Sequence, residues 1–136
     1  MMSSKTLVPR LPCGGFSLAL KVKPVPASRP RVTRWGTYHA KTYRAYLDAA
    51  NLTLPDCDTP VEGHLRVDIE FICNRPKTTK LTTPRGDLDN YVKGPLDVLT
   101  RKGYWKDDVQ VVELHATKRF ANSDEEPQAL IVVQVL

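Results

Sequence analysis

The chain has 136 residues, with 20 Lys and Arg against 15 Asp and Glu, a formal net charge of +5, and 41% hydrophobic residues. This composition is typical of one globular domain, which we expect over residues 1–136 with a flexible N-terminal segment at residues 1–14. The apolar runs are too short to span a bilayer, and Pro9, Arg10 and Pro12 interrupt the N-terminal one. We therefore expect neither export nor membrane insertion.

The basic residues are concentrated at the N-terminal end. Residues 1–47 contain nine Lys and Arg residues and no acid, whereas the other 89 residues hold eleven basic and fifteen acidic residues. Either one part of the surface is suited to a polyanion while another gathers carboxylates, or the uneven charge has no function.

The three cysteines form no C-x-x-C pair, and the chain has only three histidines to accompany them. We expect free thiols in a reducing cytoplasm, a buried Cys73 and no structural zinc site.

Four elements are predicted in the first half of the chain. Large apolar side chains at alternate positions of residues 16–22 predict a strand with one buried face. Residues 23–34 contain three prolines and three arginines, so we expect an exposed basic loop without regular structure. The helical spacing of apolar residues in Thr37 to Leu52 predicts an amphipathic helix. Residues 64–73 alternate strictly, which predicts a strand that buries Leu65, Val67, Ile69, Phe71 and Cys73.

A long loop and a second helix follow. Residues 74–86 hold four cations, two prolines and no acid, which predicts a long mobile loop. Apolar residues from Leu88 onwards form a helical stripe that ends before Gly103, the residue type expected just past a helix C-terminus. Pro95 interrupts the stripe, so the helix either bends there or begins near Lys93 with the proline in its first turn.

The C-terminal part is expected to be β structure. Residues 109–120 and 129–136 are rich in β-branched side chains and are separated by a polar turn, which predicts an antiparallel hairpin. The element order is then β-α-β-α-β-β. The predicted fold class is α+β, with a mixed, largely antiparallel sheet and two main helices.

Two acidic groups flank the second helix. Asp87 and Asp89 stand at its start, and because residues two apart on a helix point about 200° apart, both can face one ligand only if Asp87 is still extended. Helix capping is the alternative for both, and it is the commoner role of an isolated D-x-D. Asp107 and Asp108 precede the next strand. They are either further metal ligands or solvated turn residues. If these carboxylates meet, they supply the oxygen ligands that Mg²⁺ prefers.

Lys93 lies four residues after Asp89 and four before Asp97, with Arg101 four further on, so these side chains share one helical ridge. One interpretation is a ladder of ion pairs, each worth about 0.3 to 0.5 kcal/mol. The other is a lysine directed at a scissile phosphate, where it stabilises the negative charge of the transition state. Taken alone, the spacing favours the ladder.

A dense family resemblance covers residues 87–111. The run Asp87-Leu88-Asp89-Asn90 is followed by Lys93, Leu96-Asp97-Val98-Leu99, Gly103-Tyr104-Trp105 and Asp107-Asp108-Val109-Gln110-Val111. This pattern resembles the signature of the RusA family of Holliday junction resolvases. Pro24, Pro26, Arg29, Pro30 and Arg31 resemble the family's early proline- and arginine-rich loop.

The resemblance implies a homodimeric, Mg²⁺-dependent endonuclease, with Mn²⁺ as a substitute metal, that cuts two opposed strands of a four-way DNA junction symmetrically. It implies action on branched DNA in the cytoplasm of a bacterium or a phage-infected cell, with neither a membrane nor a small-molecule cofactor involved. By position, Asp87, Asp89 and Asp108 match the family's metal-binding aspartates, Lys93 matches its essential lysine, and Asp107 is an adjacent acid.

Cations outside this motif are expected to contact the DNA backbone: Arg29, Arg31, Arg34, Arg75, Lys77, Lys80 and Arg85. Tyr38, Tyr43, Tyr104 and Trp105 are candidates for stacking on unpaired bases, although core packing is favoured for Tyr43 and Trp105. Two other functions stay open, a general branched-DNA nuclease and a non-catalytic module that binds branched DNA.

Overall fold

The computed structural model describes residues 11, 14–28, 31–33, 36–38 and 41–136. Its main sheet consists of β1 (Phe16–Leu20), β4 (Leu65–Cys73), β5 (Val111–Phe120) and β6 (Gln128–Val135). The strand order is β1-β6-β4-β5, in which β6 runs antiparallel to both neighbours and β4 and β5 are parallel. The predicted α+β class and mixed sheet are confirmed.

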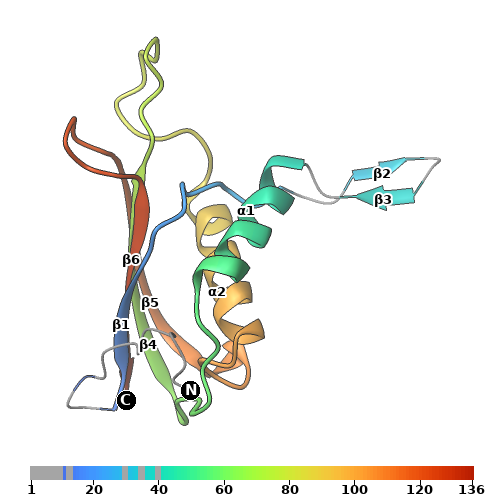
Figure 1. Cartoon of the computed structure of the whole chain (residues 1–136), viewed down its shortest axis with the longest axis vertical. Helices are drawn as coiled ribbons and strands as arrows, with labels where there is room; N and C mark the ends of the chain where they lie inside the picture. The colour runs from blue at the N-terminus through green and yellow to red at the C-terminus, as the bar shows by residue number, and fades with distance from the viewer. Residues whose placement is uncertain (1–10, 12–13, 29–30, 34–35, 39–40) are drawn as a thin grey trace, which may run out of the picture.

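Both long helices, α1 (Lys41–Thr53) and α2 (Leu88–Arg101), cover the same face of this sheet (Figure 1). The five β4 side chains predicted to point inward are all buried there. Gly94 brings the helices close together, because an added Cβ would lie 2.7 Å from Cε2 of Tyr46 on α1. No helix in the described part of the chain is long and apolar enough to cross a bilayer.

The predicted hairpin of residues 109–120 with 129–136 is wrong. β4 lies between the two strands and pairs with both, so β5 is an edge strand. The segment β4–α2–β5 is a crossover unit whose helix covers the sheet, and such connections join parallel strands. β4 buries one complete face and Ile72 besides, which favours a central position for it over β5.

The predictions for residues 23–38 need two corrections. Part of the expected loop forms β2 (Arg31–Thr33), which pairs antiparallel with β3 (Gly36–Tyr38) in an arm that projects away from the main sheet (Figure 1). Helix α1 consequently begins at Lys41 rather than at Thr37, since β3 occupies the start of the expected helix. The predicted flexible segment 1–14 falls mostly outside the described residues.

Helix α2 begins at Leu88 and contains Pro95, so a start near Lys93 is wrong. It ends at Arg101, and Gly103 adopts a φ of +84°, as a glycine past a helix end commonly does. Residues 74–86 form a loop beyond the end of β4, as predicted (Figure 1). A short 3₁₀ helix, η1 (Asp108–Gln110), leads into β5.

Candidate active site

Asp87 lies at the boundary between the 74–86 loop and α2. Its backbone is extended, with φ −79° and ψ 142°, and its carbonyl oxygen accepts the amides of Asn90 and Tyr91 at 3.1 and 3.3 Å. Its side chain does not cap the helix, so the capping alternative is wrong for this residue. Asp89 follows in the first turn, and both side chains are exposed. Neither forms an ion pair with another described residue, so both carboxylates are available to a ligand.

Two side chains hold the backbone that leads into Asp87. The Tyr91 hydroxyl donates to the carbonyl of Arg85 at 2.6 Å, and the Lys118 ammonium donates to the carbonyls of Pro84, at 2.8 Å, and Gly86. The Lys118 Nζ also lies 5.7 Å from the centre of the Tyr91 ring. The carbonyls of three consecutive residues, 84–86, are therefore anchored. These bonds fix the backbone position of Asp87, the residue directly before α2.

The sequence prediction missed this anchor, although one signal was present. Lys118 occupies the same face of β5 as Leu114, Ala116 and Phe120, which is the face toward the helices. A lysine in that alternation needs polar partners inside the fold. Burial, followed by the charge and hydrogen bond of Cys73, raises the pKa of Tyr91 to about 12, so its hydroxyl stays a donor at neutral pH.

Asp108 faces the middle of α2 from η1. Burial is the first cause that raises its pKa, followed by the hydrogen bond and charge of Asp107 and the charge of Asp97, while Lys93 opposes the shift. Lys93 Nζ lies 3.7 Å from Oδ2 of Asp97, the one rung of the predicted ladder that forms among the described residues. Asp108 therefore lies close enough to Lys93 and Asp97 for their charges to act on it.

Asp107 has a structural role at the start of η1. Its carboxylate accepts the amide of Val109 at 3.0 Å, and the side-chain oxygen of Gln110 accepts the amide of Asp107 at 3.1 Å, which completes a capping box. Gln110 also donates to the carbonyls of Val61 and Gly63, so this turn is fastened to the segment before β4.

The three predicted metal ligands are not gathered into one cage. Among the described residues, no group of three or more His, Cys, Asp or Glu side chains is arranged to hold a metal ion. Asp87 and Asp89 are not among the charges that shift the pKa of Asp108. Mg²⁺ is usually bound through one or two carboxylates together with water and substrate phosphate. The aspartates fit an open site of that kind and do not form a preformed three-carboxylate site.

The sequence matches the profile of the family described as "Endodeoxyribonuclease RusA" over residues 21–134, most of the chain. The chain belongs to the RusA family. It is 29% identical over 103 residues to proteins named crossover junction endodeoxyribonuclease RusA from Shigella sonnei and Escherichia coli K12, covering 76% of this chain and 82% of each relative. It is 31% identical over 88 residues to the protein of that name from Enterobacteria phage 82, covering 65% and 69% of the two chains. The predicted family and endonuclease class are confirmed.

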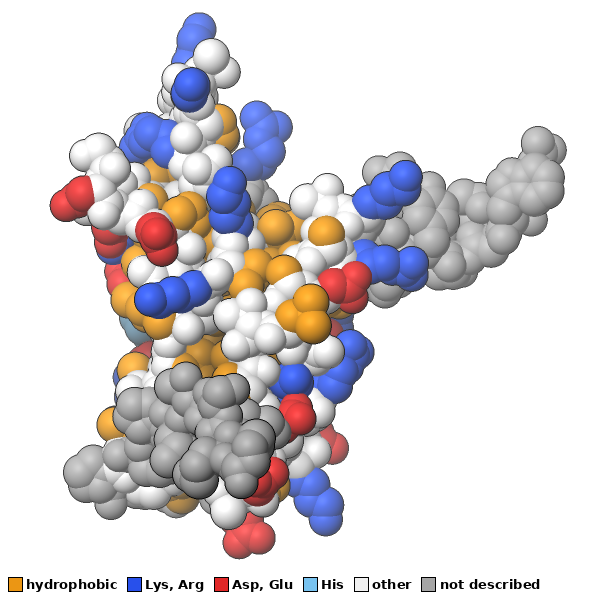
Figure 2. Space-filling view, viewed as in Figure 1, with side chains coloured by type: hydrophobic (Ala, Val, Ile, Leu, Met, Phe, Trp, Pro, Cys, Tyr) orange, Lys and Arg blue, Asp and Glu red, His pale blue; other side chains and the backbone are white. Residues whose placement is uncertain are grey.

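The RusA-family chain exposes a set of cations beside the start of α2. Lys and Arg side chains gather over the loop that joins β4 to α2 (Figure 2). The Arg75 guanidinium lies 4.5 Å from the centre of the Phe120 ring, which ties the base of the loop to β5. The structure does not describe the side chains of the β2–β3 arm, which include those of Arg31 and Tyr38. Arg29 and Arg34 also lie outside the described residues. The four predicted loop cations, Arg75, Lys77, Lys80 and Arg85, are all exposed.

The aromatic residues that the structure describes in this RusA-family chain mainly serve the core. Tyr43 and Trp105 are buried, which confirms the preferred prediction for both. Tyr104 is 1% exposed and donates its hydroxyl to the carbonyl of Pro55 at 2.7 Å, so the stacking alternative is wrong for it. Trp105 donates to Oγ1 of Thr100 at 2.6 Å.

Proposed function

We propose that this chain resolves four-way DNA junctions by Mg²⁺-dependent hydrolysis of opposed phosphodiester bonds. The observation that carries the proposal is the start of α2 in a RusA-family chain, where two unpaired carboxylates lie directly after an exposed loop with four cations and no acid. The relatives' names, crossover junction endodeoxyribonuclease, support the substrate. The proposed place of action is the cytoplasm of a bacterium or a phage-infected cell.

Asp87 and Asp89 would hold the metal together with water and a phosphate oxygen of the DNA, and Asp108 is proposed as a further ligand or as a base nearby. Mg²⁺, for which Mn²⁺ could substitute, supplies a Lewis acid for the phosphodiester and lowers the pKa of bound water. The carboxylates need no rearrangement of ion pairs to act, because Asp87 and Asp89 have no cationic partner among the described residues.

Lys93 would neutralise charge that builds on the scissile phosphate. Its side chain is 58% exposed, its ammonium pairs with Asp97, and its charge is one of those that act on Asp108. A cation fixed where negative charge develops lowers the barrier more than it stabilises the ground state. The loop cations would hold the flanking phosphates without reading sequence.

The proposed active form is a two-fold homodimer, because a single site cuts one strand at a time and a junction has two strands to cut. Support comes from β5, a ten-residue edge strand whose Val112 and Leu114 are 54% and 49% exposed. Val109, just before it, is 76% exposed. A long edge strand with exposed apolar side chains is a template for pairing with another chain, so β5 is the proposed interface.

Leu114→Glu tests this interface. It should convert the dimer to a monomer in sedimentation velocity and should uncouple the two cuts, so that nicked junctions accumulate. Leu52→Glu, on an exposed position of α1, is the matched control and should remain dimeric. A dimer that survives Leu114→Glu would place the interface elsewhere.

Asp89→Asn tests the proposed function directly. With a synthetic four-way junction and Mg²⁺, cleavage should fall on the order of 10³-fold, because an amide is a poorer metal ligand than a carboxylate, while junction binding persists. Asp124→Asn, an exposed aspartate in the β5–β6 loop, should cleave like the wild type. Undiminished cleavage by Asp89→Asn would overturn the site. Equal wild-type rates on junctions, forks and linear duplex would indicate a general nuclease, and absence of nicking with intact binding would indicate a binding module.

A further inference from the structure

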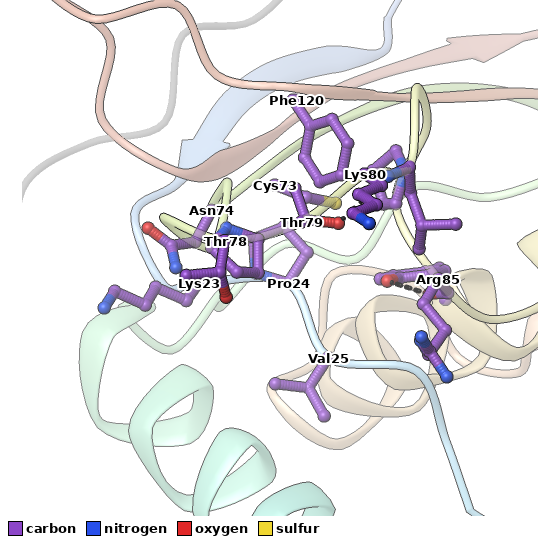
Figure 3. A pocket seen from close by; sticks show the side chains of 14 residues that line it. Lys23, Pro24, Val25, Cys73, Asn74, Thr78, Thr79, Lys80, Arg85 and Phe120 are labelled. Carbon is purple, nitrogen blue, oxygen red and sulfur yellow. Dashed lines mark hydrogen bonds between the residues drawn. The ribbon is translucent and has the colours of Figure 1, made fainter.

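A cavity of about 620 Å³ opens between residues 23–25, which follow β1, and the loop of residues 74–86 (Figure 3). Phe120 at the end of β5 and Val25 line opposite sides of it. The cavity is therefore built from three parts of the chain that are far apart in sequence, and its walls belong to the ordered core as well as to the loop.

The cavity adjoins the proposed site of cleavage. Arg85, two residues before Asp87, and Tyr91, in the first turn of α2, both line it. Tyr91 and Arg85, which are joined by a hydrogen bond from the Tyr91 hydroxyl to the Arg85 carbonyl, separate the cavity from the start of the helix. The cavity therefore begins two residues before Asp87 in the chain.

The charge of the lining is entirely positive. Lys23, Lys80 and Arg85 line the cavity, and no Asp or Glu does. Lys23 lies at one end of the cavity, and Lys80 and Arg85 lie toward the other end (Figure 3). None of the three forms an ion pair with a described carboxylate. The cavity therefore favours a ligand with negative charge at both ends.

The middle of the cavity has the chemistry of a base-binding site. Apolar and aromatic groups such as Val25 and Phe120 line it, and bases bind to such surfaces when they leave the stack. The side chains of Asn74 and Thr78 also line it and make no hydrogen bond with other described residues, so they are available to a base edge.

We propose that this cavity receives one unpaired nucleotide of the cleaved strand, directly next to the scissile phosphate. The flanking phosphates contact the cations at the two ends, and the base lies between the apolar walls, where Asn74 and Thr78 give a preference among bases. The proposal rests on the proposed function and adds to it a source of sequence preference, since the phosphate contacts carry none.

A fluorescent base measures the event. The full chain is bound, with Ca²⁺ replacing Mg²⁺, to four-way junctions that carry 2-aminopurine in turn at each nucleotide around the cleavage position. The fluorescence of 2-aminopurine rises when it leaves the stack, so one position should brighten clearly. If wild-type protein cuts the junction with Mg²⁺ and no position brightens, the cavity proposal is overturned while the function stands; if it cuts no junction, the function itself fails.

Thr78→Trp fills the cavity from an exposed loop position, and Thr82→Trp is the matched control, because Thr82 is exposed in the same loop and does not line the cavity. Thr78→Trp should abolish the brightening and slow cleavage about tenfold, in line with the loss of one stacked base. An abasic nucleotide at the brightening position should restore wild-type cleavage to Thr78→Trp. Wild-type brightening in Thr78→Trp would contradict the proposal. Lys80→Met should weaken the brightening even if the tryptophan variant fails to fold.

Discussion

The carboxylates of this protein are held in two opposite ways. On the open face of the sheet, Arg119 binds Glu70 at 3.2 Å and Glu125 at 2.6 Å, so these acids are positioned through their own oxygens. At the start of α2, Asp87 is positioned through the backbone anchored by Lys118, and its carboxylate oxygens form no ion pair with a described residue and do not cap the helix. The first arrangement uses the carboxylates for structure, whereas the second leaves them for a ligand.

The pKa shifts give a related contrast between Glu125 and Asp108, the aspartate that faces the middle of α2. The hydrogen bonds from Arg119 lower the pKa of Glu125 to about 2, whereas burial and the neighbouring Asp107 and Asp97 raise the pKa of Asp108. An acid whose charge is already compensated has little to gain from a cation. An acid among other acids gains from one, which supports Asp108 as a proposed further ligand beside Asp87 and Asp89.

Lys118→Met should produce the largest effect among the variants that test this comparison. Without the ammonium, the carbonyls of Pro84 and Gly86 lose their donor and Asp87 loses its fixed position. Loss of a residue that orients a metal ligand typically costs about 10- to 100-fold in activity. Cleavage should fall by that amount, with a rise in the Mg²⁺ concentration needed for half-maximal rate and little change in junction affinity.

Lys102→Met provides the control, because Lys102 is also anchored, in an ion pair with Asp56 at 3.0 Å, but lies at the other end of α2. It should leave the Mg²⁺ dependence unchanged. Lys118→Arg should recover part of the activity. An unaltered Mg²⁺ dependence in Lys118→Met would mean that the backbone anchor does not position the metal ligand.

The sequence predicted the individual helices and strands better than it predicted which strands pair in the sheet. Alternation in residues 64–73 identified β4 and its buried face, and helical spacing identified α1 and α2, because local burial imposes these periods. Which strands pair depends on contacts across the sheet, so the predicted hairpin of β5 with β6 is wrong. The order of β4, α2 and β5 would have indicated a parallel crossover, since a helix between two strands usually makes one. The three-residue strands of the β2–β3 arm are too short to show a periodic pattern of apolar residues.

The candidate site was predicted in the same uneven way. Asp87 has the extended backbone that both carboxylates need to face one ligand, and this condition was within reach of the sequence because a helix boundary is a local feature. The anchoring role of Lys118 depends on a contact across 32 residues, from β5 to Gly86, which no local pattern reports. The capping role of Asp107 lay within local reach, since Gln110 follows it at the spacing of a capping box.

Asp108→Asn should stabilise the metal-free protein. The folded-state pKa of Asp108 is raised above its ordinary 3.8, so at pH 7 its charge opposes folding, whereas below pH 3.8 the group is protonated in both states. In EDTA at pH 7 we expect Tm to rise by about 1–3 °C. The gain should vanish at pH 3, and Asp124→Asn should show none. A lower Tm at pH 7 would mean that the carboxylate is compensated by partners, as on the open face of the sheet.

Glu125→Gln should have the opposite sign and the smallest effect. The folded-state pKa of Glu125 is about 2 against an ordinary 4.5, so its ionised form stabilises the fold above pH 4.5, and this contribution is lost as the pH falls toward 2. The bond to Arg119 is only partly buried, so we expect Tm to fall only about 1–2 °C at pH 7 and to match the wild type below pH 2. Cleavage should be unaffected. Glu126→Gln, on the adjacent exposed residue, should leave Tm unchanged. An equal loss at both pH values would show that Glu125 acts through packing, and the contrast between paired and unpaired acids would then rest on the α2 side alone.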